Sequence, residues 1–220
     1  DCALTLAALG GGRPADLRGA RLKGARLAVL ETEVLDDLRD APGAAFRSAS
    51  ERLQAAGAAV DRVAAPEVAE AMSMSGILYT AEAYGTWADV IEASPEKMFA
   101  PILQRFRQGR EYSAADYVAA WHRLDVLRGE WRARFAAYDA VIMPTVPNLP
   151  PDAARLMEDD TYYVTENLLT LRNTRVANLM GLPAISLPTG VPSCGIMLCG
   201  AAFGEERLLR LAAAAEAAPN

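Results

Sequence analysis

The stretch from residue 27 to residue 63 decides the fold class. It opens with the apolar run Leu27-Ala28-Val29-Leu30 and closes with Val60-Asp61-Arg62-Val63. Each run is short and rich in aliphatic residues, which predicts a buried strand. A strand, a helix and a second strand joined in this order normally form a right-handed parallel crossover. The stretch therefore indicates an α/β protein.

The segment between the two runs has the pattern of a helix. Asp40 fits the N-cap, Pro42 fits an early helical position and Gly57 fits the C-cap. Apolar residues recur at helical spacing, and they are Phe46, Ala49, Leu53 and Ala56. This spacing places one apolar face of the helix against the predicted strands.

The chain as a whole divides into three parts, of which this stretch is the first. A strand-helix-strand unit covers about 25–65, a helical insertion covers about 66–138, and a final group of strands and helices covers 139–217. In the final part, short apolar runs predict strands over 140–143, 184–187 and 196–199, and helices are expected over about 165–180 and 205–217. We expect a mixed sheet covered by helices.

The helical insertion ends in one long predicted helix that follows the capping-box sequence Ser113-Ala114-Ala115-Asp116. Its apolar stripe consists of Val118, Trp121, Leu124, Leu127, Trp131 and Phe135. Its arginines fall mostly off this stripe, which favours a solvated face over a binding patch.

Composition excludes several functions. The 220 residues carry a formal net charge of −6, whereas phosphate binding relies on clustered basic residues. No apolar stretch reaches the roughly 20 residues that span a bilayer, and Asp1-Cys2-Ala3-Leu4 lacks the basic segment of a signal peptide. The three cysteines show no CxxC spacing. We therefore expect a cytoplasmic protein that binds neither nucleic acid nor membrane.

The residues by themselves offer weak candidates for chemistry. Ser193 lacks the context of a nucleophile elbow and is better explained as a loop hydroxyl. Cys194 has no histidine or lysine near it in sequence, so a core or loop thiol is the simpler interpretation. The single histidine, His122, excludes a multi-histidine metal site, and its place beside Trp121 on the long helix favours partial burial or surface packing. Gly10-Gly11-Gly12 follows no strand and is expected to form a turn.

One run has a more specific pattern, Asn173-Thr174-Arg175-Val176-Ala177-Asn178-Leu179-Met180-Gly181-Leu182-Pro183-Ala184-Ile185-Ser186-Leu187-Pro188-Thr189-Gly190. It resembles the C-terminal motif of the amidase signature family. Tyr138-Asp139-Ala140-Val141-Ile142-Met143-Pro144-Thr145 and Gly195-Ile196-Met197-Leu198-Cys199-Gly200 resemble further family segments in the same order. The resemblance implies the C-terminal part of the family's three-layer α/β/α fold.

The resemblance also implies a reaction. Members of this family hydrolyse amide bonds with a Ser-cis-Ser-Lys triad, without a cofactor or metal. The triad normally precedes the region that matches Asp1, and neither Lys23 nor Lys97 stands beside a serine-rich turn. We therefore assign no catalytic residue here and expect this chain to be inactive by itself, with the catalytic half of an intact amidase as its partner.

Substrate-pocket residues are the part of the site that the resemblance places in this chain. Thr174 corresponds to a threonine that contacts ligands in several family members, although a helix hydroxyl that bonds back to a carbonyl explains it equally well. Met143 and Thr145 lie at the end of a predicted strand, where α/β ligand sites form. Asn178 is a weaker candidate, since it is also expected to fix the turn into the next strand.

A departure from the family pattern bears on the substrate. The A subunits of glutamine-using tRNA amidotransferases hold an amino acid with an arginine and an aspartate, where this chain has Leu124 and Leu171. This favours a small, less charged amide. Two alternatives remain, a non-catalytic binding or structural domain and a protein like the A subunit of glutamyl-tRNA amidotransferase. Apolar faces that the other half would cover also favour a homo-oligomer of the isolated chain.

Overall fold

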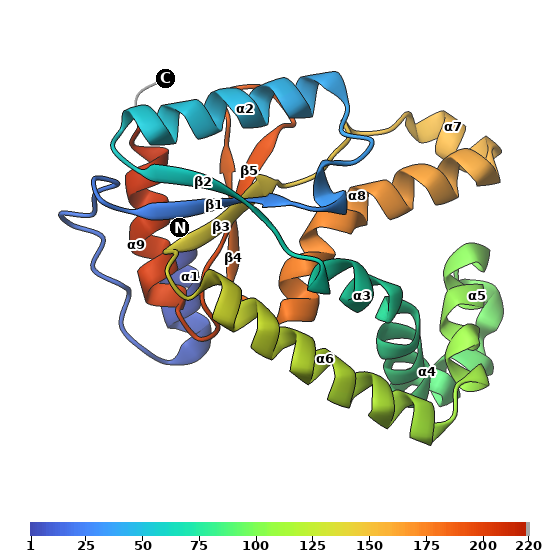
Figure 1. Ribbon diagram of the computed structural model, residues 1–220. Helices are drawn as coiled ribbons and strands as arrows, with labels where there is room; N and C mark the ends of the chain where they lie inside the picture. The colour runs from blue at the N-terminus through green and yellow to red at the C-terminus, as the bar shows by residue number, and fades with distance from the viewer. Residues whose placement is uncertain (219–220) are drawn as a thin grey trace. The chain divides into compact units, whose positions relative to one another are not determined.

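The strands of the protein form one mixed sheet. The computed structural model describes residues 1–218, and in them five strands lie in the order β2-β1-β3-β5-β4 (Figure 1). Their bounds are β1 Arg26–Glu31, β2 Ala59–Ala64, β3 Ala140–Pro144, β4 Ala184–Pro188 and β5 Gly195–Cys199. All five lie at or within one residue of the predicted runs, which confirms the α/β class.

Both parallel and antiparallel pairing occur in this sheet. β1 pairs in parallel with β2, with Leu27 opposite Val60, and in parallel with β3, with Leu27 opposite Ala140. β5 runs antiparallel to both β3 and β4. The turn between β4 and β5 is short enough for a hairpin. The parallel strands need longer connections, which are the helix between β1 and β2 and the helical segment between β2 and β3.

The helices differ from the predictions mainly at their ends. They are α1 Cys2–Gly10, α2 Asp40–Ala55, α3 Glu67–Ser73, α4 Ser75–Ala93, α5 Ala100–Gln108, α6 Ala114–Phe135, α7 Ala153–Glu158, α8 Asp160–Met180 and α9 Glu205–Glu216, with 3₁₀ turns at Glu33–Leu35, Pro95–Lys97 and Gly109–Glu111.

Two predicted helix starts were wrong. α8 begins at Asp160, because the Asp159 carboxylate caps it by accepting from the Tyr162 N–H at 2.9 Å. α2 begins with Asp40 as its first helical residue, and the N-cap is Arg39, which makes no side-chain capping bond. In both cases the apolar spacing identified the helix but not its first turn.

The chain splits into two compact units, one formed by Glu67–Glu130 and the other by Asp1–Pro66 with the chain from Trp131 onward. The first unit is helical. Within it, Leu124 and Leu127 of α6 are buried as predicted, but Val118 is 50% exposed and does not belong to the buried stripe. His122 is exposed, so of the two alternatives for it partial burial is wrong.

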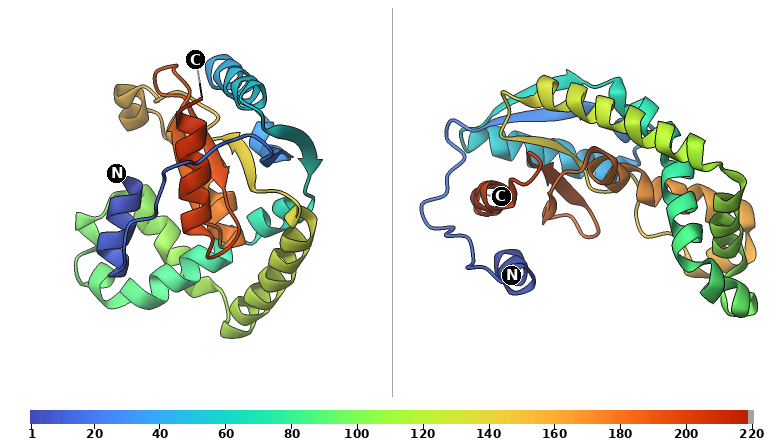
Figure 2. Two further views of the ribbon diagram at one scale, coloured as in Figure 1. Left: turned by 90° about the vertical axis from the view of Figure 1, so that its left-hand side faces the viewer. Right: turned by 90° about the horizontal axis from the view of Figure 1, so that it is seen from below.

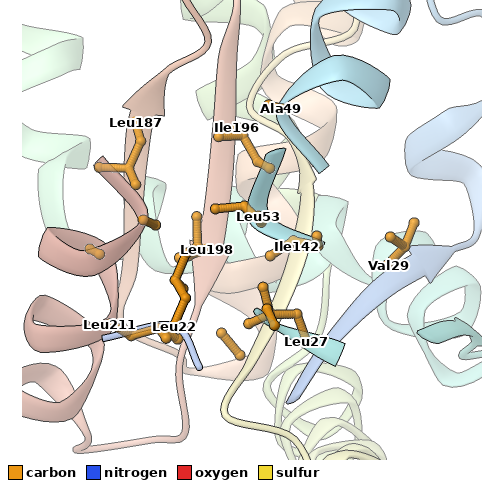
Figure 3. Packing of buried hydrophobic residues seen from close by; sticks show 14 of the residues in the cluster. Leu22, Leu27, Val29, Ala49, Leu53, Ile142, Leu187, Ile196, Leu198 and Leu211 are labelled. Carbon is orange, nitrogen blue, oxygen red and sulfur yellow. The ribbon is translucent and has the colours of Figure 1, made fainter. Parts of the chain in front are cut away.

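In the second unit, α2 and α9 pack on one face of the sheet. Alternate strand residues point to this face, including Leu27, Val29, Ile142, Ile196 and Leu198 (Figure 3). Leu53 of α2 and Leu211 of α9 meet them in the same cluster. α1 contacts α9 (Figure 2).

The opposite face of the sheet carries the intervening residues. Those of the central strands, such as Val141, Met143 and Met197, are buried. On the edge strand β4, however, Ala184, Ser186 and Pro188 are exposed on this face. The uncovered part of the sheet therefore lies over β4, next to the end of β3.

Candidate functional site

A pair of hydroxyl groups marks the end of β3 and the middle of β4. The Oγ1 atom of Thr145 and the Oγ atom of Ser186 are 2.6 Å apart and share a hydrogen bond. The backbone N–H of Thr145 donates to the carbonyl oxygen of Gly195 at 2.9 Å, which continues the pairing of β3 with β5 by one residue. Both hydroxyls therefore occupy fixed positions on the uncovered face.

Gly195 gives these hydroxyls the space that they occupy. A Cβ atom at this position would lie 2.6 Å from Ser186 Oγ and 2.7 Å from Thr145 Oγ1, closer than real Cβ contacts. Beside the pair lies an open hollow of about 560 Å³. Its lining includes Thr145, Ser186, Pro188, Val191 and Ser193. The hollow offers hydroxyl donors within a mainly apolar wall.

A second element of the site is the exposed face of α8. At about 100° per residue, the positions 164, 167, 168, 171, 174, 175 and 178 fall on one side of the helix. Val164, Leu168, Leu171, Thr174 and Asn178 are exposed, whereas Leu169, Asn173, Val176 and Met180 on the other side are buried. Two predicted substrate contacts, Thr174 and Asn178, thus lie on the same accessible face.

The hydroxyl of Thr174 is not free of the helix. Its Oγ1 atom donates to the carbonyl oxygen of Leu171 at 3.2 Å. This is the back-bonding geometry that the sequence left open as the alternative to a substrate contact. The residue remains exposed, so a molecule at the surface of α8 can still reach it.

Asn173 was missed as a functional position. It is fully buried, and its Nδ2 atom donates to the carbonyl oxygens of Val34 at 3.1 Å and Pro144 at 2.8 Å. These two bonds connect α8 to the end of β3 and to the 3₁₀ turn after β1. The signal in the sequence was a polar residue at a buried position of the helical repeat, beside the candidate Thr174.

Arg172 strengthens the same connection. Its guanidinium is half buried and donates to the carbonyl oxygens of Asp36 at 2.5 Å and Val34 at 3.3 Å. Burial lowers the pKa of Arg172, and the negative charges of Asp36, Asp37 and Glu33 oppose that change. The Arg172 side chain therefore fixes the loop after β1 through these two hydrogen bonds.

Met143 does not lie where its predicted role requires. Its side chain is 0% exposed, because β3 is a central strand and both of its faces are covered at this position. A ligand at the surface cannot reach it in this structure. Of the strand-end candidates, only Thr145 is accessible, and the substrate contact of Met143 stays a prediction.

A third polar group lies at the N-terminal half of α8. The buried carboxylate of Glu166 accepts from Arg39 Nη2 at 2.8 Å and from Asn148 Nδ2 at 2.8 Å. Asn148 is buried as well and also bonds with Thr170. This network attaches the proline-rich loop after β3 to α8, beside an open hollow of about 620 Å³.

The structure places no activated nucleophile among these residues. In residues 1–218, no hydrogen bond joins Ser193 to a histidine or lysine, and Ser193 occupies a loop with φ of 61°. Burial raises the pKa of the Cys194 thiol and raises that of Cys199 to about 12. Neither thiol is therefore a ready nucleophile near neutral pH.

The described residues 1–218 contain no group of three or more His, Cys, Asp or Glu side chains that could hold a metal ion. None of their helices combines the length and the apolar character needed to cross a bilayer.

Comparison with known proteins identifies the family. A family model described as Amidase matches residues 13–209. A 2-amino-5-chloromuconic acid deaminase from Comamonas testosteroni is 31% identical over 206 residues, which cover 90% of this chain and 44% of the relative. This chain thus spans less than half of that relative's length.

Solved structures agree with this match. The A subunit of the glutamyl-tRNA(Gln) amidotransferase of Thermotoga maritima is 26% identical with a TM-score of 0.63, over 92% of this chain and 45% of that one. An allophanate hydrolase of Kluyveromyces lactis shares the fold at 18% identity with a TM-score of 0.76, over 94% and 34% of the two chains. From the family model and these relatives we conclude that this chain belongs to the amidase family, as its resemblance to the amidase signature predicted.

Proposed function

We propose that this chain forms the scaffold and part of the substrate pocket of an enzyme that hydrolyses a carbon-nitrogen bond in a small amide. The supporting observation is an accessible polar region at the end of β3, the Thr145–Ser186 hydroxyl pair, beside the strand end to which Asn173 attaches α8, whose exposed face carries Thr174 and Asn178. Such a region suits binding. It has no base next to a hydroxyl or thiol, so it does not suit nucleophilic attack.

The reaction would need residues from outside this chain. In this proposal the Ser-Ser-Lys triad belongs to a preceding catalytic half of the intact protein, and the chain of 220 residues alone has negligible activity. Oxyanion donors and pocket residues without a nucleophile leave little turnover. We further propose a cytoplasmic enzyme without a nucleic-acid or membrane partner.

Each candidate residue has a role in this proposal. Thr174 and Asn178 contact the substrate from α8, and Thr145 does so from the end of β3. Met143 supports the pocket from beneath, since its side chain is buried directly before Pro144 and Thr145 at the end of β3. The exposed Leu171 makes an apolar wall where an α-amino group would need a carboxylate.

The relatives support a C–N bond as the target. One is named as a deaminase of 2-amino-5-chloromuconic acid and others as the A subunit of glutamyl-tRNA(Gln) amidotransferase. A second candidate function is that amidotransferase role, which would require further partner proteins. A third is a non-catalytic binding or structural domain. This candidate is favoured because residues 1–218 contain no nucleophile that is paired with a general base.

Hydrolysis assays test the proposal. Purified chain and a longer protein that includes the upstream sequence are compared on a panel of simple aliphatic and aryl amides. We expect ammonia release only from the longer protein, and loss of activity when its nucleophilic serine is replaced. Absence of turnover in both proteins would favour the binding or structural role. Turnover by the short chain that depends on Ser193 or Cys194 would contradict the proposal that the catalytic residues lie outside this chain.

A further inference from the structure

The exposed face of α8 carries one basic group among neutral side chains. Between Val164 and Asn178, this face consists of aliphatic, amide and hydroxyl residues together with Arg175. No acidic residue occurs on it within that span. Asp160 lies on the same side of the helix, but 15 residues separate it from Arg175, or about 22 Å at 1.5 Å per residue.

Arg175 differs from its neighbour Arg172 in what it contacts. Arg172 donates to the backbone of the loop after β1 and is fixed there. Arg175 is partly buried, and within residues 1–218 its side chain has no hydrogen bond, ion pair or ring contact. A partly desolvated guanidinium normally has an anionic or carbonyl partner, because its donors otherwise lose hydration without compensation.

We propose that Arg175 binds a carboxylate of the substrate, so that the pocket accepts amides that carry an acid group at the end opposite the scissile amide. This inference rests on the proposed amidase function and names its substrate class. A guanidinium binds a carboxylate through two parallel N–H donors, which makes the contact both strong and directional. Asn178 lies three residues after Arg175 and four residues after Thr174, so its side chain neighbours both on the helix surface, and one ligand can span the three positions.

The remaining composition of the face narrows the substrate further. An α-amino acid amide also presents an ammonium group, whose charge a carboxylate compensates best when it is desolvated. The span from Val164 to Asn178 offers Leu168 and Leu171 where such a partner would stand, and both are exposed. The face therefore fits a molecule with an apolar body and one carboxylate, and it disfavours a free amino acid.

Two substrates of equal chain length test this inference in the intact protein that contains this chain. Glutaramate has a carboxylate at the carbon where pentanamide has a methyl group, and both have the same primary amide. We expect the intact enzyme to prefer glutaramate in kcat/KM. Arg175→Gln should lower kcat/KM for glutaramate by about tenfold to a hundredfold, mainly through KM, because it removes a charge-assisted hydrogen bond. Pentanamide hydrolysis should stay unchanged.

Matched variants separate recognition from a general effect. Arg47→Gln removes one positive charge from an exposed position on α2 and should leave both substrates unaffected. Arg175→Lys keeps the charge without the forked donors and should recover part of the glutaramate activity. If the wild type hydrolyses both amides equally and Arg175→Gln changes neither, the carboxylate site is wrong while the amidase function stands. If neither those two amides nor the aliphatic and aryl panel is hydrolysed, the amidase proposal fails, and the carboxylate site fails with it.

Discussion

The side-chain amide of Asn173 in α8 donates to the carbonyl oxygen of Pro144, the last residue of β3, at 2.8 Å. The same Nδ2 atom donates to Val34 at 3.1 Å, so one buried amide attaches the helix to two separate segments of the sheet layer. The exposed side of α8 and the hydroxyl of Thr145 then have fixed positions relative to each other. The geometry of the candidate site thus depends on a residue that does not face it.

Replacing Asn173 should destabilise the fold. Asn173→Leu keeps the size of the side chain but removes the side-chain donor to the buried Pro144 carbonyl oxygen and leaves the Val34 carbonyl oxygen with the longer bond from Arg172, which costs about 1 to 3 kcal/mol. Asn173→Asp should cost at least as much at neutral pH, because a carboxylate would face two acceptors. Urea unfolding of the protein measures both effects. Thr174→Val on the exposed side is the control and should stay within about 0.5 kcal/mol of the wild type. Equal stability of Asn173→Leu and Thr174→Val would contradict this role.

Gly195→Ala should also destabilise, because its Cβ atom would lie 2.6 Å from Ser186 Oγ and 2.7 Å from Thr145 Oγ1. We expect a loss of about 1 to 3 kcal/mol, since the three strands cannot separate without breaking their pairing. Gly85→Ala is the matched control. Gly85 lies in α4 with no atom within 4 Å of the added Cβ, so the same substitution should raise stability there by about 0.5 to 1 kcal/mol. Thermal unfolding of both variants gives the comparison, and a stabilising Gly195→Ala would rule out the close packing of the hydroxyl pair.

The sequence predicted the sheet better than the site. Strand runs such as Ala140–Met143 are short, apolar and bounded by turn residues, so local pattern alone locates them. The same continuous apolar run is typical of a buried strand, so it predicts the burial of Met143 and disagrees with the candidate role of that residue as a substrate contact. The exposure of Val118 does not follow from its pattern, because it depends on what α6 packs against. Asn173 was passed over because its two carbonyl partners lie 29 and 139 residues away in sequence.

The buried carboxylate of Glu166 should make Arg39 important for stability. Arg39 is the cation paired with Glu166, whose side chain is 9% exposed. Arg39→Ala leaves this carboxylate with Asn148 as its remaining side-chain donor, and we expect a loss of about 1 to 3 kcal/mol. Adding Glu166→Gln should restore part of that loss, because the double variant has no buried charge. A double-mutant cycle by urea unfolding measures the coupling, and additive losses would show that the pair is not energetically linked.

An ion pair in the helical unit should give a pH-dependent contribution to stability. Arg107 donates to both carboxylate oxygens of Glu92, and these bonds hold the pKa of Glu92 below its ordinary value of 4.5. A group with a lowered folded-state pKa stabilises the fold above its unfolded pKa and loses this contribution as pH falls through the folded pKa. Glu92→Gln should therefore lower the melting temperature at pH 7 and have a smaller effect at pH 3. Glu96 is exposed and has no ion pair in residues 1–218, so Glu96→Gln is the control and should show no such pH dependence. An effect of Glu92→Gln on the melting temperature that is equal at both pH values would contradict the prediction.

The three cysteines should react with a thiol reagent at different rates. Cys2 is exposed, whereas Cys194 and Cys199 are buried. Burial raises the pKa of both buried thiols, to about 12 for Cys199, and the thiolate is the reactive form. At pH 8 in native buffer we expect one equivalent of reagent to react fast, and Cys2→Ser should remove this reaction. Cys194, in its loop, should react slowly. Cys199 should not react until the sheet unfolds. Labelling in denaturant should give all three, and fast native labelling at Cys199 would show that the face of β5 is more open than its burial indicates.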